Sequence, residues 1–209
     1  NHDGNADVIV GSTNADDGAN GLVDAGNVTV LSSVTAEALF TAYGDRAKTL
    51  FGTSVAAGDV NHDGFDDVLV GSPGDVNGTL KNAGSIAVFS GSTGVRLTKQ
   101  FGATASAYHG NSVAVGDVNG DGFADIIAGS WKDDTLHAPF ISNAGSVFIR
   151  SGNGYRLLGM LYGNAANDYF GAAVSAGDIN SDGKADVIIG VPGFTKGAGA
   201  VRVLSGDAL

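Results

Sequence analysis

The chain has 209 residues, a formal net charge of -11 and no cysteine. Its 11 Lys and Arg residues are scattered without a basic stripe, which argues against nucleic-acid binding. Disulfides, thiolate metal sites and cysteine nucleophiles are excluded because each needs cysteine. No stretch approaches the ~20 apolar residues of a membrane-spanning helix. Glu37 is the only glutamate among 22 acidic residues, so the negative charge resides almost entirely on aspartate.

The first 50 residues form an incomplete unit. They open on alternating oxygen-bearing side chains and then enter an apolar run, Val8-Ile9-Val10, which is typical of a buried strand. A long polar loop follows at 13–25. Residues 36–43 have a composition that suits a helix, but we expect a strand there because the later copies of the unit have one.

Residues 51–108 form the first complete unit. We expect its four strands at 54–58, 67–71, 84–90 and 95–101. A nine-residue acidic loop joins the first two strands, and a variable loop joins the second and third. Glycine is placed at strand ends and turns, where a positive φ or a close backbone approach is needed.

The same order of elements returns in residues 109–169 and, in part, in residues 170–209. The expected strands are 109–113, 126–129, 145–151 and 155–161 in the third unit, and 170–174, 187–190 and 199–204 in the fourth. The acidic loops begin at Asp59, Asp117 and Asp178, so the period is 58 and then 61 residues. Four short strands per unit are typical of a propeller blade. We therefore predict an all-β fold, a single β-propeller segment over residues 1–209 of about 3.5 four-stranded blades, with partial units at 1–50 and 170–209.

The acidic loop between the first two strands has the composition of a metal site. Oxygen-bearing side chains stand at its positions 1, 3, 5 and 9, and glycine stands at position 6. Ca²⁺ takes six to eight oxygen ligands at about 2.3 to 2.6 Å. With the backbone carbonyl of position 7, the predicted ligand sets are Asp59, Asn61, Asp63, Phe65 and Asp67; Asp117, Asn119, Asp121, Phe123 and Asp125; and Asp178, Asn180, Asp182, Lys184 and Asp186. A truncated set of Asn1, Asp3, Asn5 and Asp7 opens the chain and lacks only the first aspartate.

Two other interpretations fit part of this pattern. An EF-hand requires glutamate at position 12 and flanking helices, whereas position 12 is here Val70, Ala128 or Ile189, inside an apolar strand. Asp, Asn and Gly are also common turn residues without any metal. Three copies in one register favour calcium, and we expect three full structural Ca²⁺ sites and one truncated site.

Short motifs flank each loop and carry a family resemblance. Phe51-Gly52 precedes the first strand of its unit and Gly71-Ser72-Pro73 follows the second. The corresponding motifs are His109-Gly110 with Gly129-Ser130-Trp131, and Phe170-Gly171 with Gly190-Val191-Pro192. Together with the loops, they resemble the FG-GAP repeat of integrin alpha chains and bacterial secreted proteins. The resemblance implies a propeller, calcium loops and an extracellular, secreted or cell-surface location, while His109 and Trp131 depart from its usual Phe and Pro.

The sequence offers no catalytic constellation outside the loops, so we expect no enzyme. A glycosidase, for example, needs two carboxylates about 5 to 9.5 Å apart, and no spare aspartate has a context that singles it out. His2 and His62 occupy position 4 of acidic loops, where we expect exposed polar residues that point away from the ion. We expect His109 to be packed in its blade.

The loops opposite the calcium loops form the predicted ligand-binding face. The connections at 13–25, 73–83 and 131–144 emerge there and differ in length within a strict repeat. The candidate ligand-binding residues are Trp131, Lys132, Asp133, His137 and Phe140, because aromatic groups beside polar ones suit a protein or sugar surface. Alternatively, Trp131 only covers the blade edge. Tyr43, Tyr108 and Tyr169 are recognition groups or, as we expect, packing groups between blades.

These observations favour a calcium-stabilised extracellular module for adhesion or ligand binding, with a protein or glycan as its partner. One alternative is a non-catalytic propeller domain attached to a secreted hydrolase or polysaccharide lyase, and another is a self-associating scaffold element. A propeller commonly has more blades than four, and the resemblance suggests seven. We therefore expect the remaining blades to come from a longer parent chain or from a second copy.

Overall fold

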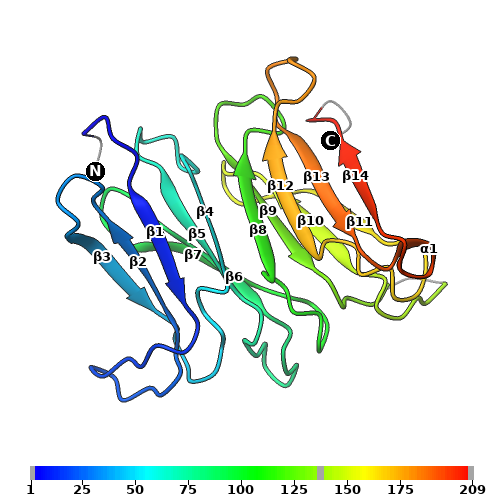
Figure 1. Ribbon diagram of the computed structural model, residues 1–209, viewed down its shortest axis with the longest axis horizontal. Helices are drawn as coiled ribbons and strands as arrows, with labels where there is room; N and C mark the ends of the chain where they lie inside the picture. Colours follow the sequence, from blue (N-terminus) through cyan, green and yellow to red (C-terminus); the bar gives the residue numbers. More distant parts are fainter. Residues whose placement is uncertain (1–2, 136–138, 207–209) are drawn as a thin grey trace.

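The computed structural model describes residues 3–135 and 139–206. In this part of the chain, fourteen strands form four antiparallel sheets that follow one another in sequence order (Figure 1). The sheets comprise β1 (Val8–Ser12), β2 (Asn27–Leu31) and β3 (Ala38–Tyr43); β4 (Ser54–Gly58), β5 (Asp67–Ser72), β6 (Ser85–Phe89) and β7 (Arg96–Phe101); β8 (Ser112–Gly116), β9 (Asp125–Ser130), β10 (Ser146–Arg150) and β11 (Leu157–Tyr162); and β12 (Ala173–Gly177), β13 (Asp186–Val191) and β14 (Ala200–Leu204). Each sheet is a meander in which every strand pairs with its neighbour in sequence. The predicted all-β, propeller-like architecture, with two four-stranded blades between partial first and last units, is therefore confirmed.

The first strands of successive sheets, β1, β4, β8 and β12, lie next to one another. The sheets are thus stacked face to face, and the apolar cores lie between them. One core joins Val28 and Val30 of the first sheet to Val70 of the second. Two further cores repeat this arrangement between the second and third sheets and between the third and fourth. Because the second strands β5 and β9 are covered on both faces, every residue in them is buried.

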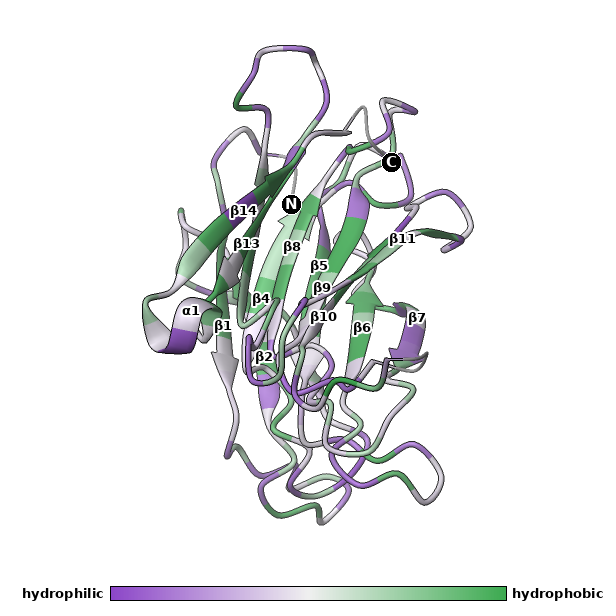
Figure 2. Cartoon of the chain, turned by 90° about the vertical axis from the view of Figure 1, so that its right-hand side faces the viewer, coloured by the Kyte–Doolittle hydropathy of each residue, from purple (hydrophilic) through white to green (hydrophobic). Residues whose placement is uncertain are grey.

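Strands such as β6 are strongly hydrophobic, whereas β7 is largely hydrophilic and the loops carry residues of both kinds (Figure 2). On the outward faces of the two outer sheets, Val8, Val10, Val201 and Val203 are exposed. Among the described residues, no helix is long and apolar enough to cross a membrane.

The first strands of the third and fourth sheets begin later than the sequence predicts. They start at Ser112 and Ala173, whereas residues 109–113 and 170–174 were expected to be extended. The reason is that His109-Gly110 and Phe170-Gly171 form corners before the strands. The backbone N–H of His109 donates to the carbonyl of Ala83, just before β6 of the preceding blade, at 3.0 Å, and that of Phe170 donates to Ala144, just before β10, at 2.9 Å. The aromatic-glycine motif therefore joins one blade to the previous one.

Glycine is needed at these corners for two reasons. Gly52, Gly110 and Gly171 have φ of 87°, 81° and 81°, a conformation that other residues rarely adopt. Their carbonyl oxygens also lie so close to a glycine of the preceding sheet that a Cβ on Gly71 or Gly129 would collide with them. Two glycines thus allow neighbouring backbones to meet at each interface.

The remaining differences are local. Residues 38–43 are strand β3, as expected from the repeat rather than from composition. The structure adds a four-residue element that was not predicted, α1 (Phe194–Gly197), in the short connection between β13 and β14. Thr195 and Lys196 have positive φ within it, so α1 is a turn and not a regular helix.

Candidate metal loops and the opposite face

The three acidic loops connect the first and second strands of their sheets, and position 9 of each loop begins the second strand. The position 9 carboxylates of Asp67, Asp125 and Asp186 are all buried. In each case one oxygen accepts the N–H of position 2, at 3.0 to 3.2 Å. The other oxygen accepts the N–H of a glycine in the turn after the third strand, at 3.1 to 3.3 Å. Position 9 therefore attaches the loop to the rest of its blade.

Positions 1 to 7 also repeat the same hydrogen bonds. The position 1 aspartate accepts the N–H of the position 6 glycine at 2.9 Å in all three loops. The position 3 asparagine accepts the N–H of position 5, and the position 5 aspartate accepts the N–H of position 7, at 2.8 to 3.0 Å. The backbone is left-handed at position 4 and at position 6. The three loops therefore share one geometry as well as one sequence pattern.

The donor set of each loop suits a hard cation, because it consists only of carboxylate, amide and carbonyl oxygens. Among the described residues, however, no three His, Cys, Asp or Glu side chains form a group that could hold a metal ion. The carboxylates instead accept backbone N–H groups, and three like charges repel one another when no cation lies between them. The residue types fit calcium, while the converged site stays a prediction.

Burial makes two of the position 9 carboxylates, those of Asp67 and Asp125, difficult to ionise. Burial, with a smaller contribution from the charge of Asp63, raises the pKa of Asp67 to about 6, although the hydrogen bond from Gly91 opposes the increase. Burial likewise raises the pKa of Asp125 to about 6. At position 5 of the last loop, the hydrogen bond from the Lys184 N–H lowers the pKa of the exposed Asp182. A bound cation would stabilise the ionised form of both buried groups.

The opening segment keeps part of this geometry. Asp3 accepts the N–H of Asn5 at 2.9 Å, which matches the bond between positions 5 and 7 in the full loops. Asp7 accepts the N–H of Ser33, just after β2, at 3.2 Å. Asn1 lies outside the described residues, so its predicted role has no structural counterpart.

The opposite face carries an aromatic cluster, which consists of Tyr108, Trp131 and Tyr169. The Trp131 ring lies between the two tyrosines, with centroid distances of 5.8 Å to Tyr108 and 5.4 Å to Tyr169. The Nζ of Lys132 lies 4.5 Å from the centroid of the Trp131 ring. The tyrosines belong to two successive connections between sheets, so the cluster spans neighbouring blades. The three rings remain partly exposed.

The other candidate ligand-binding residues differ in position. Phe140 is 70% exposed, whereas Asp133 is buried, with 3% of its surface exposed. The Asp133 carboxylate accepts hydrogen bonds from the hydroxyls of Ser146, at 2.7 Å, and Thr104. It is therefore occupied within the fold and does not belong to the exposed face. His137 lies outside the described residues.

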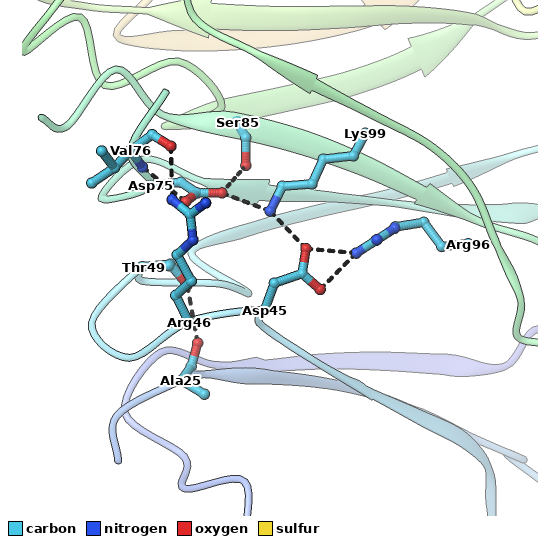
Figure 3. A network of polar contacts seen from close by, with 9 residues as sticks. All are labelled: Ala25, Asp45, Arg46, Thr49, Asp75, Val76, Ser85, Arg96 and Lys99. Carbon is cyan, nitrogen blue, oxygen red and sulfur yellow. Dashed lines mark hydrogen bonds and ion pairs between the residues drawn. The ribbon is translucent and has the colours of Figure 1, made fainter. Parts of the chain in front are cut away.

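Sequence reasoning missed a polar network at the interface of the first two blades (Figure 3). The buried Asp75 lies 2.7 Å from the Nζ of Lys99, which also contacts Asp45 at 3.0 Å. Arg96 donates to both oxygens of Asp45, at 2.7 and 2.8 Å. Burial opposes ionisation of Asp45, but the hydrogen bonds from Arg96 and Lys99 outweigh it and lower its pKa. The network links the connection between sheets to β7, and its members lie too far apart in sequence for any local motif to indicate it.

The segments that contain the repeated corners, acidic loops and close glycine contacts also match a family model. The FG-GAP repeat model matches residues 51–89, 109–149 and 170–204, together more than half of the chain. The chain belongs to the FG-GAP repeat family.

Integrin alpha chains are among its relatives. Integrin alpha-2 of Bos taurus is 33% identical over 177 residues, and integrin alpha pat-2 of Caenorhabditis elegans is 34% identical over 174 residues. The matches cover 80% and 76% of this chain but only 14% of either relative. The chain is thus an integrin alpha-like FG-GAP propeller segment and spans a small part of those proteins.

Solved structures show the same fold at lower sequence identity. A rhamnogalacturonan lyase of Bacillus licheniformis superposes with a TM-score of 0.57 at 17% identity, over 99% of this chain and 39% of that one. The rhamnogalacturonan lyase YesW superposes with a TM-score of 0.52 at 15% identity, over 90% of this chain and 38% of that one. At such identities the likeness concerns the fold alone.

Proposed function

We propose that this FG-GAP segment is a non-catalytic, calcium-stabilised extracellular module that binds a protein or glycan ligand. The relation to integrin alpha chains supports the extracellular location and the adhesion role. The observation that carries the calcium proposal is one loop geometry repeated three times, in which the position 1 carboxylate accepts the N–H of the position 6 glycine at 2.9 Å. In each loop, positions 1, 3, 5 and 9 would contribute side-chain oxygens and position 7 a carbonyl.

Calcium in these loops would act as a structural ion. It would neutralise converging carboxylates, including the buried position 9 group, and so fix the connection between the first two strands. Position 9 also binds the turn after the third strand. An ordered loop therefore stabilises three strands of its blade.

Chelation tests the calcium proposal. We expect excess chelator to lower the melting temperature and equilibrium dialysis to find three bound ions per chain. Extracellular calcium modules have dissociation constants of about 10⁻⁴ to 10⁻³ M. At 10 mM calcium, each site should therefore add about 1.4 to 2.7 kcal/mol to the free energy of unfolding. Unchanged melting in chelator, or fewer than two ions per chain, would contradict the proposal.

A matched pair of substitutions locates the ions. Asp63→Ala removes a position 5 ligand and should lose one ion while the other two sites remain. Asp66→Asn changes the exposed neighbour at position 8, which is not a predicted ligand, and should keep all three ions. Equal ion loss in both variants would show that general acidity, rather than the loop geometry, binds the metal.

The proposed ligand surface is the aromatic cluster of Tyr108, Trp131 and Tyr169 with Lys132 and the exposed Phe140. Amphipathic rings beside a cation suit protein and sugar ligands. The ring contacts of Trp131 also support its packing role, so Phe140→Ser is a cleaner probe than substitution of Trp131. We expect Phe140→Ser to weaken the binding of the chain to arrays of purified glycans and matrix proteins. Val95→Ser, at an exposed site in the connection between β6 and β7, is the control and should leave binding unchanged.

A further inference from the structure

The residue at position 4 of the 59–67 loop reaches the next loop. His62 has φ of 60°, and its Nδ1 lies 2.7 Å from the carbonyl oxygen of Gly122. Its ring also contacts the ring of Phe123, with 5.1 Å between the centroids. Gly122 and Phe123 occupy positions 6 and 7 of the 117–125 loop. A single side chain that was expected to be only an exposed polar group therefore connects two acidic loops.

The imidazole of His62 holds one end of a peptide group whose other end contacts a predicted ligand. The carbonyl of Gly122 accepts from His62 in the tautomer with hydrogen on Nδ1. The N–H of the same peptide, on Phe123, donates to Asp121 at 3.0 Å. Hydrogen bonds in such a chain polarise one another and become stronger. His62 is thereby linked through one peptide group to the Asp121 carboxylate and to the backbone that leads to the Phe123 carbonyl, which are two of the five predicted ligands.

The 117–125 and 178–186 loops are neighbours in the same way, but position 4 of the 117–125 loop has no side chain that could donate a hydrogen bond. Position 4 of the 117–125 loop is Gly120, which has no side chain. A Cβ built on Gly120 would lie 3.2 Å from Cε of Lys184, the position 7 residue of the 178–186 loop. Position 4 thus faces position 7 of the following loop in both pairs, but only His62 supplies a hydrogen bond. The second pair of loops, which lacks the histidine, therefore serves as an internal control for the first pair.

We propose that His62 couples calcium binding in the 59–67 loop to calcium binding in the 117–125 loop, whereas the 178–186 loop binds independently. The inference rests on the calcium sites proposed above. Asn61 and Asp63 flank His62, so an ion held by them would fix the backbone that carries the imidazole. The imidazole would then order the Gly122–Phe123 peptide before the second ion binds. Coupling of this kind is reciprocal, so each ion raises the affinity of the other loop by the same factor.

A double-mutant cycle with Asp63→Ala and His62→Gly tests the coupling. Calcium titration followed by NMR reads each loop separately through the amides of Gly64, Gly122 and Gly183, which make the same 2.9 Å bond in all three loops. We expect Asp63→Ala to raise the calcium dissociation constant at Gly122 by about fivefold and to leave Gly183 unchanged. Glycine accepts the positive φ at position 62 without strain.

His62→Gly alone should weaken calcium binding at Gly122 to a similar extent, and adding Asp63→Ala should weaken it no further. A purely structural role for His62 would leave the effect of Asp63→Ala intact in the His62→Gly background. Ser181→Gly is the matched control, because Ser181 has the same position and a φ of 62° in the last loop. It should not change the calcium response of Gly122.

The outcomes separate the two proposals. If calcium shifts none of the three glycine amides, the calcium sites themselves are wrong. If calcium binds but Asp63→Ala leaves the affinity at Gly122 unchanged, the coupling is wrong and the calcium sites stand. If Asp63→Ala weakens binding at Gly122 equally with and without His62, the coupling does not pass through His62. An unchanged Gly183 amide in every variant confirms that the fold is intact.

Discussion

His109 shows how one residue changes the chemistry of a repeated corner. It stands where the second and fourth units have Phe51 and Phe170, and it is buried, with its Nδ1 2.8 Å from the hydroxyl of Ser130. Burial and, to a smaller extent, the positive charge of Arg150 lower the pKa of His109 to about 4. The folded protein therefore holds a neutral imidazole at pH values where an unfolded chain would protonate it.

This difference predicts a pH dependence of stability. An unfolded histidine titrates near pH 6.5, so between about pH 6.5 and 4 the unfolded state binds more protons than the folded state. Stability should fall as the pH decreases through this window, by about 3 kcal/mol at its lower end. Above pH 6.5 both states are neutral at this position, and no effect is expected.

His109→Phe isolates this contribution. The free energy of unfolding of both proteins is measured with urea at constant calcium from pH 7.5 to 4.5. Relative to wild type, the variant should gain about 2 to 3 kcal/mol of stability as the pH decreases over this range. Carboxylates that titrate in the same range cancel in the comparison. Phe51 lies at the equivalent corner of a sheet that also has a buried serine, Ser72, so phenylalanine suits the site. A difference that is constant with pH would refute the assignment.

At the scale of the strand, the close approach of glycine backbones sets the distance between blades. A Cβ on Gly129 in β9 would collide with the carbonyl oxygen of Gly171, whereas a Cβ on the equivalent Gly190 in β13 would lie 3.4 Å from the Cβ of Ala173, an ordinary contact. Neither glycine has a positive φ, so alanine is compatible with both backbones.

Gly129→Ala and Gly190→Ala therefore form a matched pair. Gly129→Ala should reduce the free energy of unfolding by about 2 kcal/mol or more, because the next blade must move. Gly190→Ala should be neutral or stabilise by up to about 1 kcal/mol, since alanine restricts the unfolded chain. Denaturant unfolding measures both. Equal losses would mean that the blades do not meet at these glycines.

The repeat period explains how much of the fold could be predicted. Spacing alone gave the four units, the loops between first and second strands, and β4 at its observed bounds. The sequence could not show that His109-Gly110 turns before β8, because its partner Ala83 belongs to the preceding blade. Burial of Asp133 was missed for a similar reason, since its partners Thr104 and Ser146 come from other segments.

The acidic loops were predicted between the strands that they join in the structure, but their links to other segments were not foreseen. The hydrogen bond from Gly91 to Asp67 spans 24 residues, and the contact between His62 and Gly122 spans 60. The second separation is close to the repeat period. In a stacked repeat, residues one period apart are neighbours, so a search at that spacing is the one signal that would have indicated the contact.

For the whole molecule, the two outer sheets expose faces that the repeat buries elsewhere. Val201 and Val203 on β14 are 68% and 52% exposed. Val147 and Ile149, at the same places on β10, are fully buried under the next sheet. The outer face therefore has the side chains of an interface between blades. We propose that further blades cover it, either from a longer parent chain or from a second copy.

The proposal predicts that the 209-residue chain associates through this face. An exposed apolar sheet face favours association with another sheet, so sedimentation should show a mass that increases with protein concentration. Val201→Lys with Val203→Lys should suppress this association and cost less than about 1 kcal/mol of unfolding free energy, because both sites are exposed. Val147→Lys with Ile149→Lys is the matched control and should unfold the chain, since two charges would be buried without partners. If the wild type stays monomeric at every concentration, or if the lysines on β14 leave its association unchanged, this face is not an interface and the proposal of further blades loses its physical basis.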